Sequence, residues 1–179
     1  MAQASNMVIE SATRCATICI VVSALMVASN IYAQPADNLF TITRSKNANT
    51  LRYDIRRQPN GVLDTAHPVD AYWLMFAEDG RREELTWMER EWAYGFSVAE
   101  PAQLGFTLRL QAYKQRDIRV EKVGNSYRAR LVIAGKNAIL KRIYVRADDS
   151  GAIPKVAYLE LQGLSEAGEP VVERIAGRR

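Results

Sequence analysis

The stretch Tyr127–Ile133, YRARLVI, shows the pattern that decides the fold of this chain. Apolar side chains occupy every second position, at Tyr127, Ala129, Leu131 and Ile133. Successive side chains of a β-strand point to opposite faces of a sheet, so this alternation predicts a strand with one buried and one solvated face. The preceding Gly124-Asn125-Ser126 is typical of the turn that leads into such a strand.

The same two-residue period recurs after Leu39, in the segments 51–56, 106–111, 139–146, 155–162 and 171–175. In 139–146 it places Ile139 on one face with Ile143 and Val145, and Leu140 on the opposite face. Short turns separate the segments and no crossover helices are indicated, which favours antiparallel neighbours. We therefore predict a mostly β fold, an antiparallel β-sandwich or flattened β-barrel of about eight or nine strands with one short covering α-helix.

One predicted strand, Val69–Ala77 (VDAYWLMFA), carries bulky apolar residues on both faces. A strand of this kind must be covered on both sides. We expect the main core on one side and the short helix, at about 87–93, on the other.

The helix is indicated by the stretch Glu84–Phe96, ELTWMEREWAYGF. Thr86 and Glu89 have capping-box spacing, and Gly95 stands where helices commonly end in a left-handed residue. Apolar side chains recur on one helical face at Leu85, Met88 and Trp92, and we expect this face to pack on the strand at 69–77. The charged residues Glu89, Arg90 and Glu91 are expected to point into water.

The first 33 residues are predicted to be a secretory signal peptide. Their apolar run, Cys15–Ser29, follows Arg14 and is short for a membrane span. Cleavage after Ala33 leaves a leader at 34–38 and a single β domain at 39–179, exported to the periplasm or secreted, without a transmembrane span. The alternative interpretation is that the N-terminal segment is retained as a membrane anchor.

The composition restricts the chemistry of the mature chain. Both cysteines, Cys15 and Cys19, lie in the predicted signal peptide, which excludes disulfides, cysteine nucleophiles and thiolate metal sites after cleavage. The net charge of +4 is a mild excess in a mixed-charge chain, so it is typical of a soluble surface. Nucleic acid is not an expected partner, because its binding sites concentrate basic residues.

Two groups of residues are candidates for ligand binding. Aromatic side chains often line ligand sites, and the candidates of this type are Trp73, Trp87, Trp92 and Tyr94. Their alternative role is structural, within the helix and the β core. The second group is a basic surface that includes Arg52, Arg56 and Arg142 and would suit an anionic ligand. The alternative interpretation of this surface is that its basic residues form cross-strand ion pairs with neighbouring acidic residues.

No catalytic, metal or cofactor site is predicted. His67 is the only histidine, and no GxSxG motif accompanies it, which argues against a serine triad or a zinc site. Carboxylate pairs at Glu83/Glu84 and Glu89/Glu91 keep a glycan hydrolase open as an alternative, because such enzymes use two carboxyl groups. The helix dipole also explains acidic residues near a helix start.

Several motifs together resemble a known family. These are LFTITRSKNANTLRYDI from Leu39, HPVDAYWLMF from His67, the ERE-AYGF pattern ending at Phe96, LKRIYV from Leu140 and PKVAYLELQG from Pro154. They resemble a bacterial envelope family known as domain of unknown function 4833 (DUF4833). The resemblance implies a secreted or envelope protein of one domain, and no activity or catalytic residue comes with it.

The leading functional hypothesis is a non-enzymatic β domain that binds a ligand or an envelope partner. One alternative is a carrier of a lipid or another apolar molecule inside a barrel closed by the helix, which predicts a cavity beside Trp73 and Met75. The other is the envelope glycan hydrolase.

Overall fold

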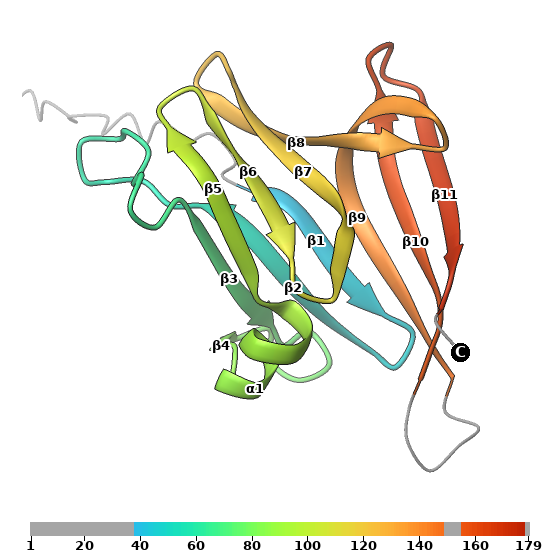
Figure 1. The fold of residues 1–179 in the computed structure, drawn as a ribbon. Coiled ribbons are helices and arrows are strands. Elements are labelled where there is room, and N and C mark those ends of the chain that lie inside the picture. Colours follow the sequence, from blue (N-terminus) through green and yellow to red (C-terminus); the bar gives the residue numbers. More distant parts are fainter. Residues whose placement is uncertain (1–37, 149–154, 178–179) are drawn as a thin grey trace, which may run out of the picture. The chain divides into compact units, whose positions relative to one another are not determined.

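The computed structural model describes residues 38–148 and 155–177, which belong to one compact unit of residues 33–179 (Figure 1). The predicted signal peptide lies outside the described residues, and so does the predicted leader except for Asn38, which begins the first strand. Within the described part, no helix is long and apolar enough to cross a membrane.

The described residues form eleven strands and one short helical segment. The strands are β1 (Asn38–Arg44), β2 (Asn47–Ile55), β3 (Val69–Leu74), β4 (Arg82–Glu84), β5 (Phe96–Ala102), β6 (Gly105–Leu110), β7 (Tyr113–Val123), β8 (Ser126–Ile133), β9 (Lys136–Asp148), β10 (Lys155–Ser165) and β11 (Pro170–Ala176). The helical segment consists of α1 (Trp87–Glu89) and the π-helical turn η1 (Arg90–Tyr94). The predicted mostly β fold with one short helix is confirmed, with two or three more strands than expected.

All eleven strands belong to one curled sheet. Its main order is β4-β3-β2-β1-β9-β8-β7-β6-β5, while β10 pairs with β9 and β11 pairs with β10. Neighbours are antiparallel except β1 and β9, which run parallel. Parallel neighbours need a long connection, and here the intervening strands β2–β8 provide it in place of a crossover helix.

The thirteen-residue strand β9 is the branch point of the sheet. Its ladder with β10 extends from Ala138 to Asp148, so β10 occupies one edge of β9 along most of its length. The other edge is divided, because β8 pairs with residues 136–139 and β1 pairs with residues 142–145. The wings β1–β4 and β5–β8 leave this edge separately and curl toward each other into a half-barrel (Figure 1).

A β-bulge between these two halves of β9 changes which side chains point inward. Leu140 and Ile143 are both buried, with exposed fractions of 0% and 3%, although they are three residues apart. Lys141 is the extra residue of β9 at an irregularity in its ladder with β10. The predicted faces of Ile139 and Leu140 were therefore wrong, because strict alternation does not continue across the bulge.

The two wings enclose the core between them. Tyr53 of β2 is fully buried, stacks on Phe40 with 4.5 Å between ring centroids, and meets Phe96 of β5 edge-on at 6.0 Å. Its hydroxyl donates a hydrogen bond to the carbonyl oxygen of Tyr94 at 2.7 Å. This bond satisfies a buried polar group and ties one wing to the segment that leads into the other.

Gly163 of β10 is required next to the bulge. A Cβ atom at this position would lie 2.4 Å from the carbonyl oxygen of Ile139 and 2.8 Å from the Cδ1 atom of Ile133. The first contact is with backbone, which cannot rotate away as a side chain can. A larger residue would therefore push β10 away from β9.

We expect Gly163→Ala to lower the free energy of unfolding by about 1–3 kcal/mol, because the added methyl group overlaps the backbone of β9. Urea denaturation followed by circular dichroism measures the change. The matched control is Gln162→Ala at the neighbouring position, which removes two side-chain hydrogen bonds, one from Arg142 and one to Glu160, and should cost about 1 kcal/mol. Unchanged stability in Gly163→Ala would contradict the close packing at the bulge.

Candidate functional site

A groove of about 690 Å³ opens on the concave side of the half-barrel. Its volume lies within the range of about 300–1,000 Å³ that is usual for small-molecule sites. The lining is mostly apolar and includes Ile42, Tyr94, Ile143, Val145, Leu159 and Ile175. Lys114 and Lys155 are the charged residues among the described lining side chains. The groove therefore combines a wide apolar surface with a small number of polar groups.

The floor of the groove is assembled by strand register. Ile42 of β1 lies opposite Ile143 of β9. Farther along, Val145 of β9 lies opposite Leu159 of β10, which lies opposite Ile175 of β11. Residues directly opposite each other share a face of the sheet, so side chains from four strands form one apolar surface. The bulge at Lys141 places Ile143 and Val145 on this surface.

The turn between β6 and β7, together with η1, forms the facing wall. The backbone N–H of Gln111 in the turn donates to the carbonyl oxygen of Gly95 at 2.9 Å. Gly95 has a φ of −67°, so the predicted left-handed helix end was wrong. The glycine is needed for close packing instead, because a Cβ there would lie 1.7 Å from the carbonyl oxygen of Arg90.

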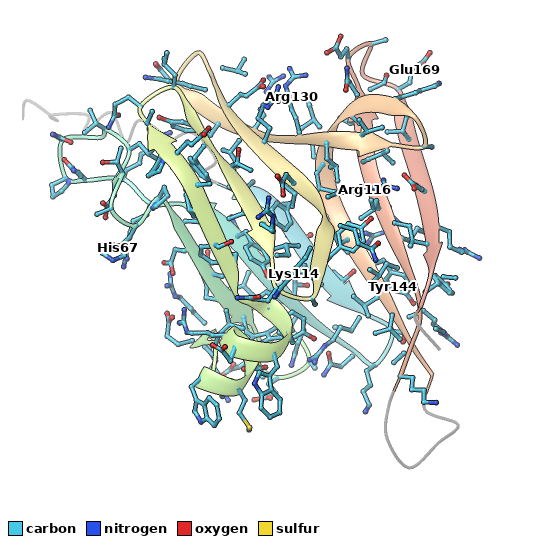
Figure 2. All side chains as sticks on the ribbon, viewed as in Figure 1. His67, Lys114, Arg116, Arg130, Tyr144 and Glu169 are labelled. Atoms are coloured by element: carbon cyan, nitrogen blue, oxygen red, sulfur yellow. The ribbon has the colours of Figure 1, made fainter. Side chains whose placement is uncertain are left out.

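An ion pair between Arg116, which is labelled in Figure 2, and Glu173 holds β7 against β11 beside the groove. Both guanidinium Nη atoms of Arg116 donate to the Glu173 carboxylate, and Nη1 lies 2.7 Å from Oε2. Nη1 also donates to the carbonyl oxygen of Val132 at 2.8 Å, and the backbone N–H of Ala134 donates to Glu173 at 2.7 Å. The hydrogen bonds from Arg116 are the main reason why the pKa of Glu173 falls to about 2.

The aromatic residues predicted to line a pocket mouth are separated in the structure. Tyr94 lines the groove, whereas Trp73 is buried behind it, with 5.2 Å between the two ring centroids. Trp87 and Trp92 are 69% and 73% exposed and meet edge-on, outside the groove lining. The groove thus lies beside Tyr94, and neither Trp73 nor Met75, where a cavity was expected, belongs to its lining.

The helical segment keeps its predicted cap but presents a different face. Thr86 and Glu89 form the capping box, and the Glu89 carboxylate also accepts a hydrogen bond from Trp73 Nε1 at 3.1 Å. Met88 is 51% exposed, and Trp92 is also exposed. The prediction that Met88 and Trp92 pack on the strand while Glu89 faces water was therefore wrong. The capping carboxylate turns toward the indole N–H, and the π-helical turn alters the side-chain spacing.

The face of β3 that points away from the core is covered by polar contacts instead of the predicted helix. The guanidinium of Arg82 lies 3.8 Å from the ring centroid of Tyr72. The hydroxyl of Tyr72 donates to Asp54 at 2.5 Å. Burial and this hydrogen bond raise the pKa of Tyr72 to about 12. A cation over an aromatic ring thus takes the place of an apolar cover.

The predicted basic residues lie outside the groove lining. Arg52 is paired with Asp54 at 3.1 Å. Arg142 lies two strands away in the same row of the sheet, and its Nε donates to Gln162 at 2.8 Å. Arg56 is exposed just beyond the end of β2. Arg52 and Arg142 are therefore held in side-chain networks on the sheet surface.

The carboxylates considered for catalysis also lie outside the groove lining. Glu83 and Glu84 form ion pairs with the arginines Arg81, Arg82 and Arg90, at 2.6–3.0 Å. Glu91 is exposed on η1, and Glu89 serves the capping box. His67 is exposed in the loop after β2 (Figure 2). Among the described residues, no three His, Cys, Asp or Glu side chains are grouped to hold a metal ion.

A second hollow, of about 440 Å³, is lined largely by charged side chains. Arg130 lies 3.2 Å from Glu121 and 3.3 Å from Glu166, and Arg119 lies 3.8 Å from Glu121. These cations and acids neutralise one another. The groove is therefore the stronger candidate for a binding site.

Lys114 and Tyr113 of the groove were not among the residues predicted from the sequence. Tyr113 is buried, whereas Lys114, its neighbour in β7, is exposed. Their alternation predicts a strand, but it does not show that the two residues border an opening. The β6–β7 turn faces a distant part of the sheet, and no local sequence pattern indicates that arrangement.

We expect Glu173→Gln to lower stability at pH 7 by about 1–2 kcal/mol, since the carboxylate is only partly screened by water. The folded-state pKa of about 2 lies below the ordinary value of 4.5, so this contribution is present above about pH 5 and is lost toward pH 2. Urea denaturation from pH 7 to pH 3 should show a difference between wild type and variant that narrows with acid. Glu169→Gln, exposed in the β10–β11 turn, is the control, and a difference independent of pH would contradict this role.

Comparison with known proteins identifies the family of this chain. A family model described as domain of unknown function (DUF4833) matches residues 40–174, from β1 into β11. No curated protein and no solved structure gives a significant match. The match reaches all four strands of the groove floor, and Ile175 lies one residue beyond its end. The chain therefore belongs to the DUF4833 family.

Proposed function

We propose that this protein is an exported, non-enzymatic binding domain that holds an apolar ligand in the concave groove. The observation that carries the proposal is the apolar floor that remains open. Val145, Leu159 and Ile175 pack against the core but are only partly buried. Apolar surface in a concave site loses its contact with water when a ligand binds, which favours association.

The form of the groove also supports a small apolar ligand over a large partner. Its floor is continuous across β1, β9, β10 and β11, and the β6–β7 turn with η1 faces it. Few polar side chains interrupt this surface. The alternative of an apolar-molecule carrier thus agrees with the leading hypothesis, with the site at Tyr94 and Ile175 instead of beside Trp73.

A glycan hydrolase gains no support from this site. Its candidate carboxylates at Glu83, Glu84, Glu89 and Glu91 do not line the groove. Hydrolysis of a glycan requires two carboxyl groups on either side of the bond that is cut.

Export is supported by the apolar run that follows Arg14. We expect the protein recovered from the periplasm of an exporting bacterium to begin at Gln34. N-terminal sequencing and intact mass measurement test this expectation. A periplasmic or membrane-bound product that retains Met1 would instead support the uncleaved anchor.

We expect the protein to bind the neutral, apolar fluorophore N-phenyl-1-naphthylamine, and Ile175→Trp to weaken this binding by about tenfold or more. The larger indole fills part of the groove, because Ile175 belongs to its lining. Fluorescence titration measures the affinity. Circular dichroism and urea denaturation verify that the variant is folded.

The matched control is Val172→Trp on the same strand. Val172 is 53% exposed and does not belong to the groove lining, so its replacement should leave the affinity unchanged. Failure of the wild-type protein to bind the fluorophore would refute the proposed groove function. Equal weakening by the two substitutions would place the binding site elsewhere.

A further inference from the structure

We propose that the ligand of the groove is an anionic amphiphile, an apolar chain that ends in a carboxylate or phosphate. Its anionic end would be held by Arg44, Lys114 and Lys155, while its chain lies on the apolar floor. This inference rests on the proposed function of the groove and adds the chemical class of the ligand.

Arg44 is placed at the end of the groove floor by strand register. It is the last residue of β1 and lies opposite Val145 of β9 in the parallel ladder. Ile42 precedes it by two residues, so Arg44, Ile42 and Val145 share one face of the sheet. Ile42 and Val145 both line the groove. Arg44 itself is not among the lining residues, so its cation lies just beyond the row of apolar side chains along which the ligand would lie.

The side chain of Arg44 has an unused hydrogen-bond donor. Its guanidinium lies 4.4 Å from the ring centroid of Trp73, whose ring in turn packs against Tyr94 of the groove wall. The Nε atom is buried and has no hydrogen-bond partner among the described residues. A buried charged donor without a partner is unfavourable, and an anionic oxygen at this end of the groove would satisfy it.

The nearby carboxylate of Glu89 is already engaged by other donors. It accepts hydrogen bonds from Trp73 Nε1 at 3.1 Å and from the backbone N–H and hydroxyl of Thr86, each at 2.9 Å. These contacts fix the carboxylate in the capping box.

Two lysines add positive charge to the groove lining. Lys114 lies near the start of β7, beside the β6–β7 turn (Figure 2), and Lys155 begins β10. Both are exposed, and no acidic side chain belongs to the described lining. Lys114 lies within an uninterrupted described segment, whereas Lys155 borders residues that the structure does not describe, so Lys114 is the better position for a test. An anionic group with an apolar chain complements both parts of this lining.

The experiment compares three ligands with the same twelve-carbon chain, the anions below their critical micelle concentrations and the alcohol below its solubility limit. Dodecanoate, dodecyl phosphate and dodecanol compete with N-phenyl-1-naphthylamine for the full protein. We expect at least one of the two anions to bind about tenfold or more tightly than the neutral alcohol, because it gains charge-assisted hydrogen bonds. The ranking of the two anions distinguishes a fatty acid from a phosphate-bearing lipid. Added salt should weaken the anions and leave dodecanol unaffected.

Lys114→Gln and Arg44→Gln test the residues. Each is expected to reduce the preference for the anion several-fold while the affinity for the neutral fluorophore stays unchanged. Lys122→Gln, at the far end of β7, is the matched control and should change neither. Lys114 is exposed, so its variant keeps the test valid if Arg44→Gln does not fold.

The outcomes separate this inference from the proposed function. The anionic-amphiphile inference would be overturned if dodecanol and both anions bound with equal affinity. It would also be overturned if the preference for the anion survived both Lys114→Gln and a folded Arg44→Gln. Either result would leave the groove function standing. A protein that binds neither the fluorophore nor any of the three ligands would overturn both.

Discussion

The structure depends on the backbone hydrogen bonds along one edge of β9, which two different strands share. Buried backbone groups in a sheet must be paired, and β8 pairs the first part of this edge while β1 pairs the second. Because β8 and β1 pair with different parts of the same edge of β9, the sheet divides there into two wings, which curl around the core (Figure 1). The bulge at Lys141 lies between the two pairings, and Gly163 permits the close approach of β10 beside it.

The groove follows from the same arrangement. The wings meet where the Tyr53 hydroxyl is hydrogen-bonded to the carbonyl oxygen of Tyr94, and β10 and β11 extend the sheet from the other edge of β9. The Arg116–Glu173 pair joins β7 to β11. The apolar residues near this pair border the groove, a space that the core side chains do not fill. A concave apolar surface is thus a consequence of how the sheet branches, and the cations near its end add polarity to that surface.

The sequence predicted the elements well and their three-dimensional relations less well. Alternation in YRARLVI and the Thr86/Glu89 spacing are local patterns, and they predicted the strands and the capping box. The same rule failed at Leu140, because an inserted residue reverses all the faces that follow it. Trp92 was predicted to be buried from its helical spacing, which a π-helical turn does not keep. The groove was not predicted, since its lining comes from strands far apart in the sequence.

The central claim is that the concave groove is the ligand site, and isoleucine methyl NMR tests it most directly. Ile42, Ile143 and Ile175 belong to the groove lining, whereas Ile55, Ile118 and Ile133 are buried elsewhere in the core. On titration with N-phenyl-1-naphthylamine, we expect chemical-shift changes and probe-to-methyl contacts concentrated at the three groove isoleucines. Contacts at the other isoleucines, with the groove methyl groups unaffected, would contradict it.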